Sequence, residues 1–163
     1  MNRTAALLPF VLTLAAAMPA AAQLIPTHRI PAMLANEAVA TAVATCASQG
    51  YSESAVLVDA DGVVQAMLRG DGAGVHTLEN ARTKAFTSAA YKSDQSELVA
   101  RAKAGPISPA LTRLPGLILS EGAVVIKAGS EVIGAIGASG APGGEKDEAC
   151  ARAGLAKIAD RLK

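Results

Sequence analysis

The side chains best suited to metal chemistry are the two histidines of the chain, His28 and His76. His76 follows a glycine-rich run and comes just before a stretch with helical spacing. An imidazole beside glycines can reach a metal ion or the iron of a flat cofactor. We therefore predict His76 as a metal ligand, with a surface or helix-capping role as the alternative. His28 lies ahead of the first expected helix and is the second candidate ligand, although an ordinary surface role is favoured for it.

Charged side chains form two groups that could contact a ligand. Basic residues on either side of His76 could pair with ligand carboxylates, or could be solvated charges; they are Arg69, Arg82 and Lys84. The acidic residues follow a glycine-rich turn; they are Glu145, Asp147 and Glu148. Because a helix N-terminus favours negative charge, helix initiation explains these acids more simply than a divalent cation does.

A stretch of small residues near the C-terminus could also serve a ligand. The run from Val132 to Ala138 predicts a buried strand in which glycines such as Gly137 let a backbone or a flat ligand approach closely. Gly140 lies in the turn that follows. The glycine spacing does not match a nucleotide-binding fingerprint. Ser139 lies in Ala-Ser-Gly rather than Gly-x-Ser-x-Gly, so a binding protein is expected more than an enzyme.

The first 22 residues have the organisation of a secretory signal peptide. Arg3 supplies a positive start, Ala5 to Met18 is apolar, and Ala20-Ala21-Ala22 is a small-residue cleavage site. The apolar stretch is shorter than the roughly 20 residues that a membrane span needs, so an uncleaved anchor is the less favoured alternative. We predict one mature domain over 23–163, located in the periplasm or secreted.

The mature domain is expected to have no net charge. The whole chain has 15 basic and 14 acidic residues, and residues 1–22 contain a single charge, that of Arg3. There is no basic tail and no block of like charges. Nucleic acid is therefore not an expected partner, nor is a membrane once the signal peptide is removed.

The composition also bears on the core. Aromatic residues make up 2% of the chain, so the core must be built from small and aliphatic side chains that pack closely. So much Ala and Gly also suits tight subunit contacts, and a homo-oligomer is expected. Cys46 and Cys150 allow one disulfide in an exported protein, with two buried free thiols as the alternative.

The order of expected elements indicates an α+β layered domain. A helix over 30–49 is followed by a hairpin whose strands, 55–58 and 63–68, flank Asp61-Gly62. Thr77 is the expected N-cap of a second helix. The later elements are listed in chain order: helical character over 94–104, an irregular cover at 107–114, a possible short strand at 117–119, a second hairpin from 123–126 and 132–138, and a last helix at about 143–162.

Two blocks of sequence are specific enough to indicate a family. The first is Val-Ile-Gly-Ala-Ile-Gly-Ala-Ser-Gly-Ala-Pro-Gly-Gly-Glu-Lys-Asp-Glu-Ala-Cys-Ala at 132–151. The second combines Val-Asp-Ala-Asp-Gly at 58–62, Arg-Gly-Asp-Gly-Ala-Gly-Val-His-Thr at 69–77 and Lys-Ala-Phe-Thr at 84–87. Together they resemble the GlcG/HbpS-like haem-binding family, which also includes the C-terminal domain of PduO-type proteins. The resemblance covers nearly all of the chain after the predicted signal peptide.

The resemblance implies a profilin-like α/β/α sandwich with a five-stranded antiparallel sheet and helices on both faces. It also implies a haem cofactor, which would be bound non-covalently because the chain has no Cys-x-x-Cys-His. The expected haem contacts are His76, Thr77, Arg82, Lys84, Gly137 and Gly140, with His76 and His28 as candidate iron ligands. Relatives are often assembled into higher oligomers.

Three functions follow as hypotheses. The first is an exported haem-binding protein that sequesters, senses or transfers haem. The second is a protein that binds a small carboxylate or another metabolite, or an enzyme accessory, because relatives occur with organic-acid and diol metabolism. The third is an oligomeric structural subunit without a ligand.

Overall fold

The computed structural model describes residue 23 and residues 25–162; the predicted signal peptide lies outside this part of the chain. The helices are α1 (Ala32–Ser48), α2 (Val75–Tyr91), α3 (Gln95–Lys103) and α4 (Gly144–Ile158), with short 3-10 turns η1 (Pro109–Arg113) and η2 (Ala159–Arg161). The strands are β1 (Ser54–Asp59), β2 (Val64–Arg69), β3 (Ala123–Ala128) and β4 (Glu131–Ser139). Within residues 25–162, no helix has the length and apolar character that crossing a membrane requires.

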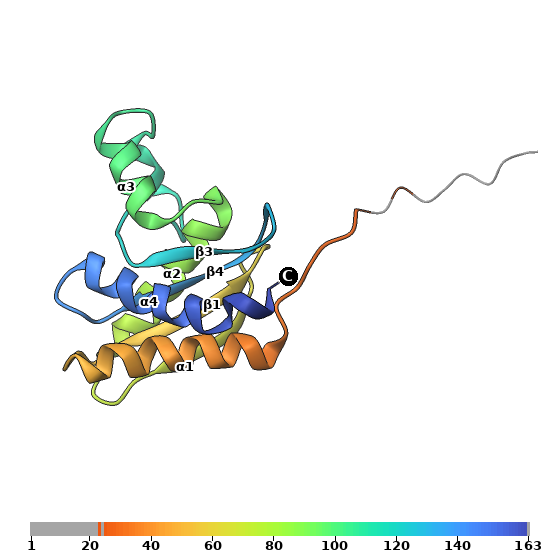
Figure 1. The fold of residues 1–163 in the computed structure, drawn as a ribbon. Helices are drawn as coiled ribbons and strands as arrows, with labels where there is room; N and C mark the ends of the chain where they lie inside the picture. The colour runs from red at the N-terminus through yellow and green to blue at the C-terminus, as the bar shows by residue number, and fades with distance from the viewer. Residues whose placement is uncertain (1–22, 24, 163) are drawn as a thin grey trace, which may run out of the picture.

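The four strands form one antiparallel sheet in the order β2-β1-β4-β3. The two predicted hairpins, β1–β2 and β3–β4, are confirmed, and β4 pairs with β1 at the centre. Helices α1 and α4 lie side by side on one face, and α2 covers the other, with α3 beyond β3 (Figure 1). The chain is therefore an α+β domain with helices on both faces of its sheet.

Side-chain alternation along the central strands builds a separate core on each face. On β1, Ala55 and Leu57 pack in the larger core with α1 and α4, whereas Val56 and Val58 face α2. The α2 side is lined largely by alanines of that helix, such as Ala81 and Ala85. The expectation of a core built from small and aliphatic residues is confirmed.

The prediction of a five-stranded sheet is wrong, because the described residues form four strands. The short apolar segment 117–119 does not become a strand, since side chains satisfy its backbone in place of a neighbouring strand. The Ile118 N–H donates to Thr87 Oγ1 at 3.1 Å, and the Ile118 carbonyl accepts from Gln95 Nε2 at 3.1 Å. This segment therefore lies as an irregular cover against α2 and α3.

Glycines set how closely helices approach the sheet and each other. A Cβ on Gly137 of β4 would collide with the Ala81 carbonyl oxygen and would lie 2.9 Å from the Ala85 nitrogen, so α2 rests directly on the strand. A Cβ on Gly154 of α4 would likewise meet the Ala38 carbonyl oxygen of α1. Both contacts are with backbone atoms, which cannot move away independently.

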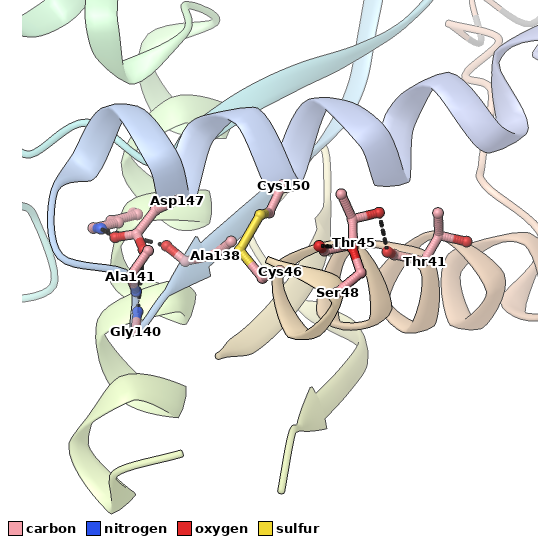
Figure 2. The surroundings of a disulfide bond; sticks show 10 residues. Thr41, Thr45, Cys46, Ser48, Ala138, Gly140, Ala141, Asp147 and Cys150 are labelled. Carbon is pink, nitrogen blue, oxygen red and sulfur yellow. Dashed lines mark hydrogen bonds and ion pairs between the residues drawn. A yellow bond between two sulfur atoms is a disulfide. The ribbon is translucent and has the colours of Figure 1, made fainter. Parts of the chain in front are cut away.

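A disulfide joins α1 to α4. Cys46 and Cys150 are 104 residues apart and both are fully buried. Figure 2 shows the bond crossing between the two helices. Of the two alternatives for these cysteines, the structure therefore has the disulfide. In the chain-entropy model, closing a loop of this length stabilises the fold by about 4–5 kcal/mol.

We expect Gly137→Ala to lower the free energy of unfolding by about 2–3 kcal/mol, because the added methyl group overpacks a backbone contact. Urea unfolding would measure this loss. Gly129→Ala is the control: its φ is +58° and its added Cβ meets no atom within 4 Å, so it reports only the left-handed backbone penalty of about 1 kcal/mol. Equal losses in the two variants would contradict close packing at Gly137.

Candidate functional site

The main candidate site is a recess where the end of β4, the start of α2 and the turn before α4 meet. Its volume is about 460 Å³. Its lining is mostly polar and glycine-rich: Ser52, Gly72, Gly74, His76, Thr77, Asn80, Lys84, Ser120, Ser139, Gly140, Ala141, Gly143, Gly144 and Asp147. We call this set the polar recess. It contains four of the predicted haem contacts, namely His76, Thr77, Lys84 and Gly140.

His76 stands at the rim of the polar recess. It is the second residue of α2, and its side chain is exposed. The ring folds back over Gly74, where an added Cβ would lie 2.7 Å from His76 Cε1. His76 also borders a second, open hollow of about 550 Å³, lined with Glu79, Asn80, Thr83, Leu117 and Ile118. We call this hollow the outer shelf; the imidazole lies where the recess and the shelf meet.

Thr77 holds the loop in front of α2 in place. Its hydroxyl donates to the Gly74 carbonyl at 2.7 Å and lies 2.8 Å from the Ser54 hydroxyl of β1. The prediction that Thr77 caps α2 is wrong, because the helix begins at Val75 and Gly74 occupies the N-cap position. The side chain is buried and ties the start of α2 to the sheet.

A buried ion pair forms the floor of the polar recess. Lys84 Nζ of α2 lies 2.6 Å from Asp147 Oδ2 of α4, and the two side chains are 2% and 5% exposed. Asp147 Oδ1 also accepts the N–H groups of Gly140 (3.1 Å) and Ala141 (2.9 Å). Burial raises the pKa of Asp147, while the Lys84 ammonium and these backbone donors act against the rise. The interpretation of Lys84 as a solvated charge is wrong, and its ammonium already has an anionic partner.

The acids at the start of α4 have different roles. Glu145 is exposed in the first turn, as helix initiation predicts. Glu148 is buried and accepts from the Ser96 hydroxyl at 2.7 Å and from Arg152 at 2.7 Å. It therefore anchors the start of α3 to α4. Helix initiation alone does not account for Asp147 and Glu148, because tertiary partners hold both.

The remaining predicted contacts lie at the edge of the polar recess or away from it. Gly140 lines it with a φ of +143°, and a Cβ there would collide with the Ser52 carbonyl oxygen. Gly137 lies beneath α2 and does not line the recess. Arg82 pairs with Glu79, its Nη2 lying 2.7 Å from Oε1, and so stands beside the outer shelf.

The structure does not bring His28 and His76 together. His28 Nδ1 lies 2.6 Å from Glu131 Oε2, at the first residue of β4. The polar recess is at the other end of that strand, where Ser139 is the last residue. The two histidines therefore belong to separate sites.

Sequence reasoning missed Asn80 in the polar recess and the buried acid Glu53, which lies outside the lining of the recess. Asn80 lies one helical turn after His76 and donates to the Ser139 hydroxyl at 2.8 Å. Its spacing from His76 is the signal that could have identified it. Glu53 is 1% exposed, and within residues 25–162 neither of its carboxylate oxygens has a hydrogen-bond partner. Burial and the neighbouring Asp147 raise the pKa of Glu53 to about 8, against the opposing effect of Lys84.

We expect Lys84→Ala to lower the free energy of unfolding by about 3–5 kcal/mol, because it leaves a buried carboxylate without its cation. The double variant Lys84→Met/Asp147→Asn removes both charges and keeps an oxygen for the Gly140 and Ala141 N–H groups. This double variant should recover most of the free energy of unfolding that Lys84→Ala loses, as measured by urea unfolding. A double variant no more stable than Lys84→Ala would show that the ion pair itself is required.

Glu53 makes stability depend on pH. Between its ordinary pKa of 4.5 and its raised value of about 8, the folded protein keeps a proton that the unfolded chain releases. The contribution of protonated Glu53 to the free energy of unfolding is therefore fully present below the pKa of Glu53 in the unfolded chain, and it is lost as the pH rises through about 8. We expect wild type to lose stability relative to Glu53→Gln across this range in urea unfolding. If the free energy of unfolding changed with pH in the same way in both proteins, the raised pKa of Glu53 would be contradicted.

Comparison with known proteins identifies the family. Residues 30–156 match the family described as haem degrading protein HbpS-like. A crystal structure of HbpS is 32% identical, with 87% of this chain and 99% of that chain covered and a TM-score of 0.79. A double mutant of Streptomyces reticuli HbpS is also 32% identical, with coverages of 90% and 98% and a TM-score of 0.78. A search of curated proteins gave no match.

More distant structures share the fold. A crystal structure of a PduOC:heme complex has a TM-score of 0.73 at 23% identity, covering 80% of this chain and 96% of that chain. At this identity the likeness shows the fold alone. The family match spans most of the chain and the HbpS structure is covered almost completely, so the chain belongs to the HbpS-like family.

Proposed function

We propose that this protein binds haem non-covalently, with His76 as the iron ligand at the junction of the polar recess and the outer shelf. The observation that carries the proposal is the position of an exposed imidazole between a polar hollow and one lined by Leu117 and Ile118. Haem has the same division, because its ring is apolar and its propionates are charged. When bound, haem would supply the redox and oxygen chemistry of its iron.

The residues present fit such a group. A porphyrin ring needs apolar contacts, and Leu117 and Ile118 of the outer shelf offer apolar side chains for them. Propionates need hydrogen-bond donors, and the hydroxyl and amide groups of the polar recess, including Ser120 and Asn80, can supply them. Arg82, now paired with Glu79, is the cation beside the shelf.

The other predicted contacts support the site in different ways. Lys84 is engaged by Asp147, so its role is to hold the floor of the polar recess. Thr77 orients the start of α2, and Gly140 leaves room beside the Ser52 carbonyl. Gly137 allows the backbone of α2 to pack directly against β4. His28 remains a candidate ligand for a separate metal site with Glu131.

Relatives support the haem assignment over the alternatives. The family whose model matches residues 30–156 is described as haem degrading. Sequestration, sensing or transfer of haem is the role proposed, together with export of the mature domain 23–163 and its assembly into a homo-oligomer. A small carboxylate is the second candidate ligand, because the polar recess offers several hydrogen-bond donors.

Hemin titration of the purified protein is the test. We expect a saturable Soret shift that His76→Ala weakens at least about tenfold, equivalent to about 1.4 kcal/mol, because the iron loses its ligand. Gly74→Ala should weaken binding less, since its backbone (φ −60°) accepts alanine while the methyl group displaces the imidazole. His28→Ala is the matched control and should titrate like wild type.

The outcomes separate the candidate functions. An unchanged titration in His76→Ala would remove His76 as the ligand. No saturable shift in wild type would overturn haem binding. In that case a thermal-shift screen with small carboxylates tests the second candidate, since a ligand at 100 times its Kd stabilises a protein by about 2.7 kcal/mol.

A further inference from the structure

The segment between Gly116 and Gly122 borders both hollows of the proposed site. Leu117 and Ile118 line the outer shelf, and Ser120 lines the polar recess. The segment follows η1 and leads into β3, and it is neither a helix nor a strand. We call residues 117–121 the wall. It lacks the regular backbone hydrogen bonds of a helix or strand, so other contacts must hold it in place.

The two ends of the wall are packed differently. The Gly122 carbonyl, next to β3, accepts the Ala138 N–H of β4 at 2.8 Å, and a Cβ on Gly122 would lie 2.9 Å from Asp147 Cβ. At the other end, a Cβ on Gly116 would meet its nearest neighbour, the Phe86 ring, at 4.0 Å. The wall is therefore closely packed where it enters β3 and has more room where it leaves η1.

Two buried side chains hold the wall between these ends. Thr87 Oγ1 of α2 accepts the Ile118 N–H at 3.1 Å, and Gln95 Nε2, from the first residue of α3, donates to the Ile118 carbonyl at 3.1 Å. Thr87 is 1% exposed and Gln95 is 0% exposed. Side chains of two different helices thus satisfy both backbone groups of one wall residue. We call this pair of contacts the clamp.

Each side chain of the clamp has a second bond that holds it in position. The Thr87 hydroxyl donates to the Thr83 carbonyl at 2.8 Å, which orients its oxygen to accept from Ile118. Gln95 Nε2 also donates to the Lys84 carbonyl at 3.2 Å. Thr83 lines the outer shelf and Lys84 lines the polar recess. The clamp therefore joins the wall to the part of α2 that borders the same two hollows.

We propose that Thr87 and Gln95 are positioning residues for haem, because they hold the wall where its apolar side chains can contact the porphyrin ring. This inference rests on the proposed function. Neither side chain lines the polar recess or the outer shelf, so both act through the Ile118 backbone. When the clamp is broken, the wall is in place in a smaller fraction of molecules, and the apparent affinity for haem falls by that fraction.

Hemin titration of Thr87→Val tests this role, because valine keeps the shape of threonine and lacks the hydroxyl. We expect the apparent Kd for hemin to rise about tenfold, since the Ile118 N–H loses its buried partner and the wall is displaced. The Soret maximum of the saturated variant should match that of wild type, because His76 still binds the iron. Thr87→Ser keeps the hydroxyl and should bind hemin nearly as tightly as wild type.

Thr45→Val is the matched control. The Thr45 hydroxyl donates to the Thr41 carbonyl at 2.8 Å, the same bond within a helix that Thr87 makes to Thr83. Helix α1 lies on the face of the sheet opposite α2 (Figure 1), so this variant should bind hemin like wild type.

Hydrogen exchange of the ligand-free proteins, measured by mass, reports on the wall directly. Peptides that cover residues 117–121 should exchange about tenfold faster in Thr87→Val than in wild type, because the wall opens locally. The same peptides should exchange at the wild-type rate in Thr45→Val. Peptides from β4 should exchange alike in all these proteins, which distinguishes a displaced wall from a general loss of stability.

The outcomes separate this inference from the proposed function. No saturable Soret shift in wild type would overturn haem binding and, with it, a positioning role toward haem. Hemin binding by wild type together with an unchanged Kd in Thr87→Val would overturn the positioning role alone. Equal losses of affinity in Thr87→Val and Thr87→Ser would do the same, because the hydroxyl would then not be the group that matters.

Gln95→Met decides the question if Thr87→Val fails to fold. Methionine has about the length of glutamine and lacks its N–H donors, while Gln95 Oε1 has no hydrogen-bond partner among residues 25–162 to lose. We expect the apparent Kd for hemin to rise about tenfold and exchange at 117–121 to become faster, for the same reason as in Thr87→Val. A wild-type Kd in this variant would contradict the role of the clamp.

Discussion

The ion pair between Lys84 and Asp147 is the interaction on which the polar recess depends. It joins α2 to α4, which lie on opposite faces of the sheet, around the end of β4. Asp147 also fixes the Gly140 and Ala141 backbone, so one carboxylate shapes the turn that borders the recess. Because both charges are buried, losing one partner costs far more than the intact pair contributes.

Close packing places these groups where they can meet. Gly137 lets α2 rest on β4, and Gly154 lets α4 rest on α1, so helix axes approach without bulky side chains between them. The disulfide then ties α1 to α4 at Cys46 and Cys150. A chain poor in aromatic residues thus obtains a rigid frame from small residues and a covalent cross-link.

Much of this architecture is predictable from the sequence. Asp61-Gly62 between two apolar runs predicts the first hairpin because that dipeptide favours a tight turn, and the hairpin forms. The family is also evident from the motif at 132–151 and is confirmed by the match over 30–156. The prediction of a fifth strand was wrong. Nothing in the sequence of an apolar segment such as 117–119 indicates that the side chains of Thr87 and Gln95 will form its backbone hydrogen bonds.

The sequence by itself therefore determined the helices, both hairpins, the family and His76 as a candidate ligand, because these depend on local spacing and motifs. Only the tertiary structure decided which charged side chains are buried and which partners they have. Lys84 and Asp147 are 63 residues apart and meet in the interior, while His28 and His76 lie at opposite ends of β4. Glu53 looks like an ordinary surface acid in the sequence, yet it is buried beside a disulfide. Such environments arise from long-range packing, which residue spacing does not encode.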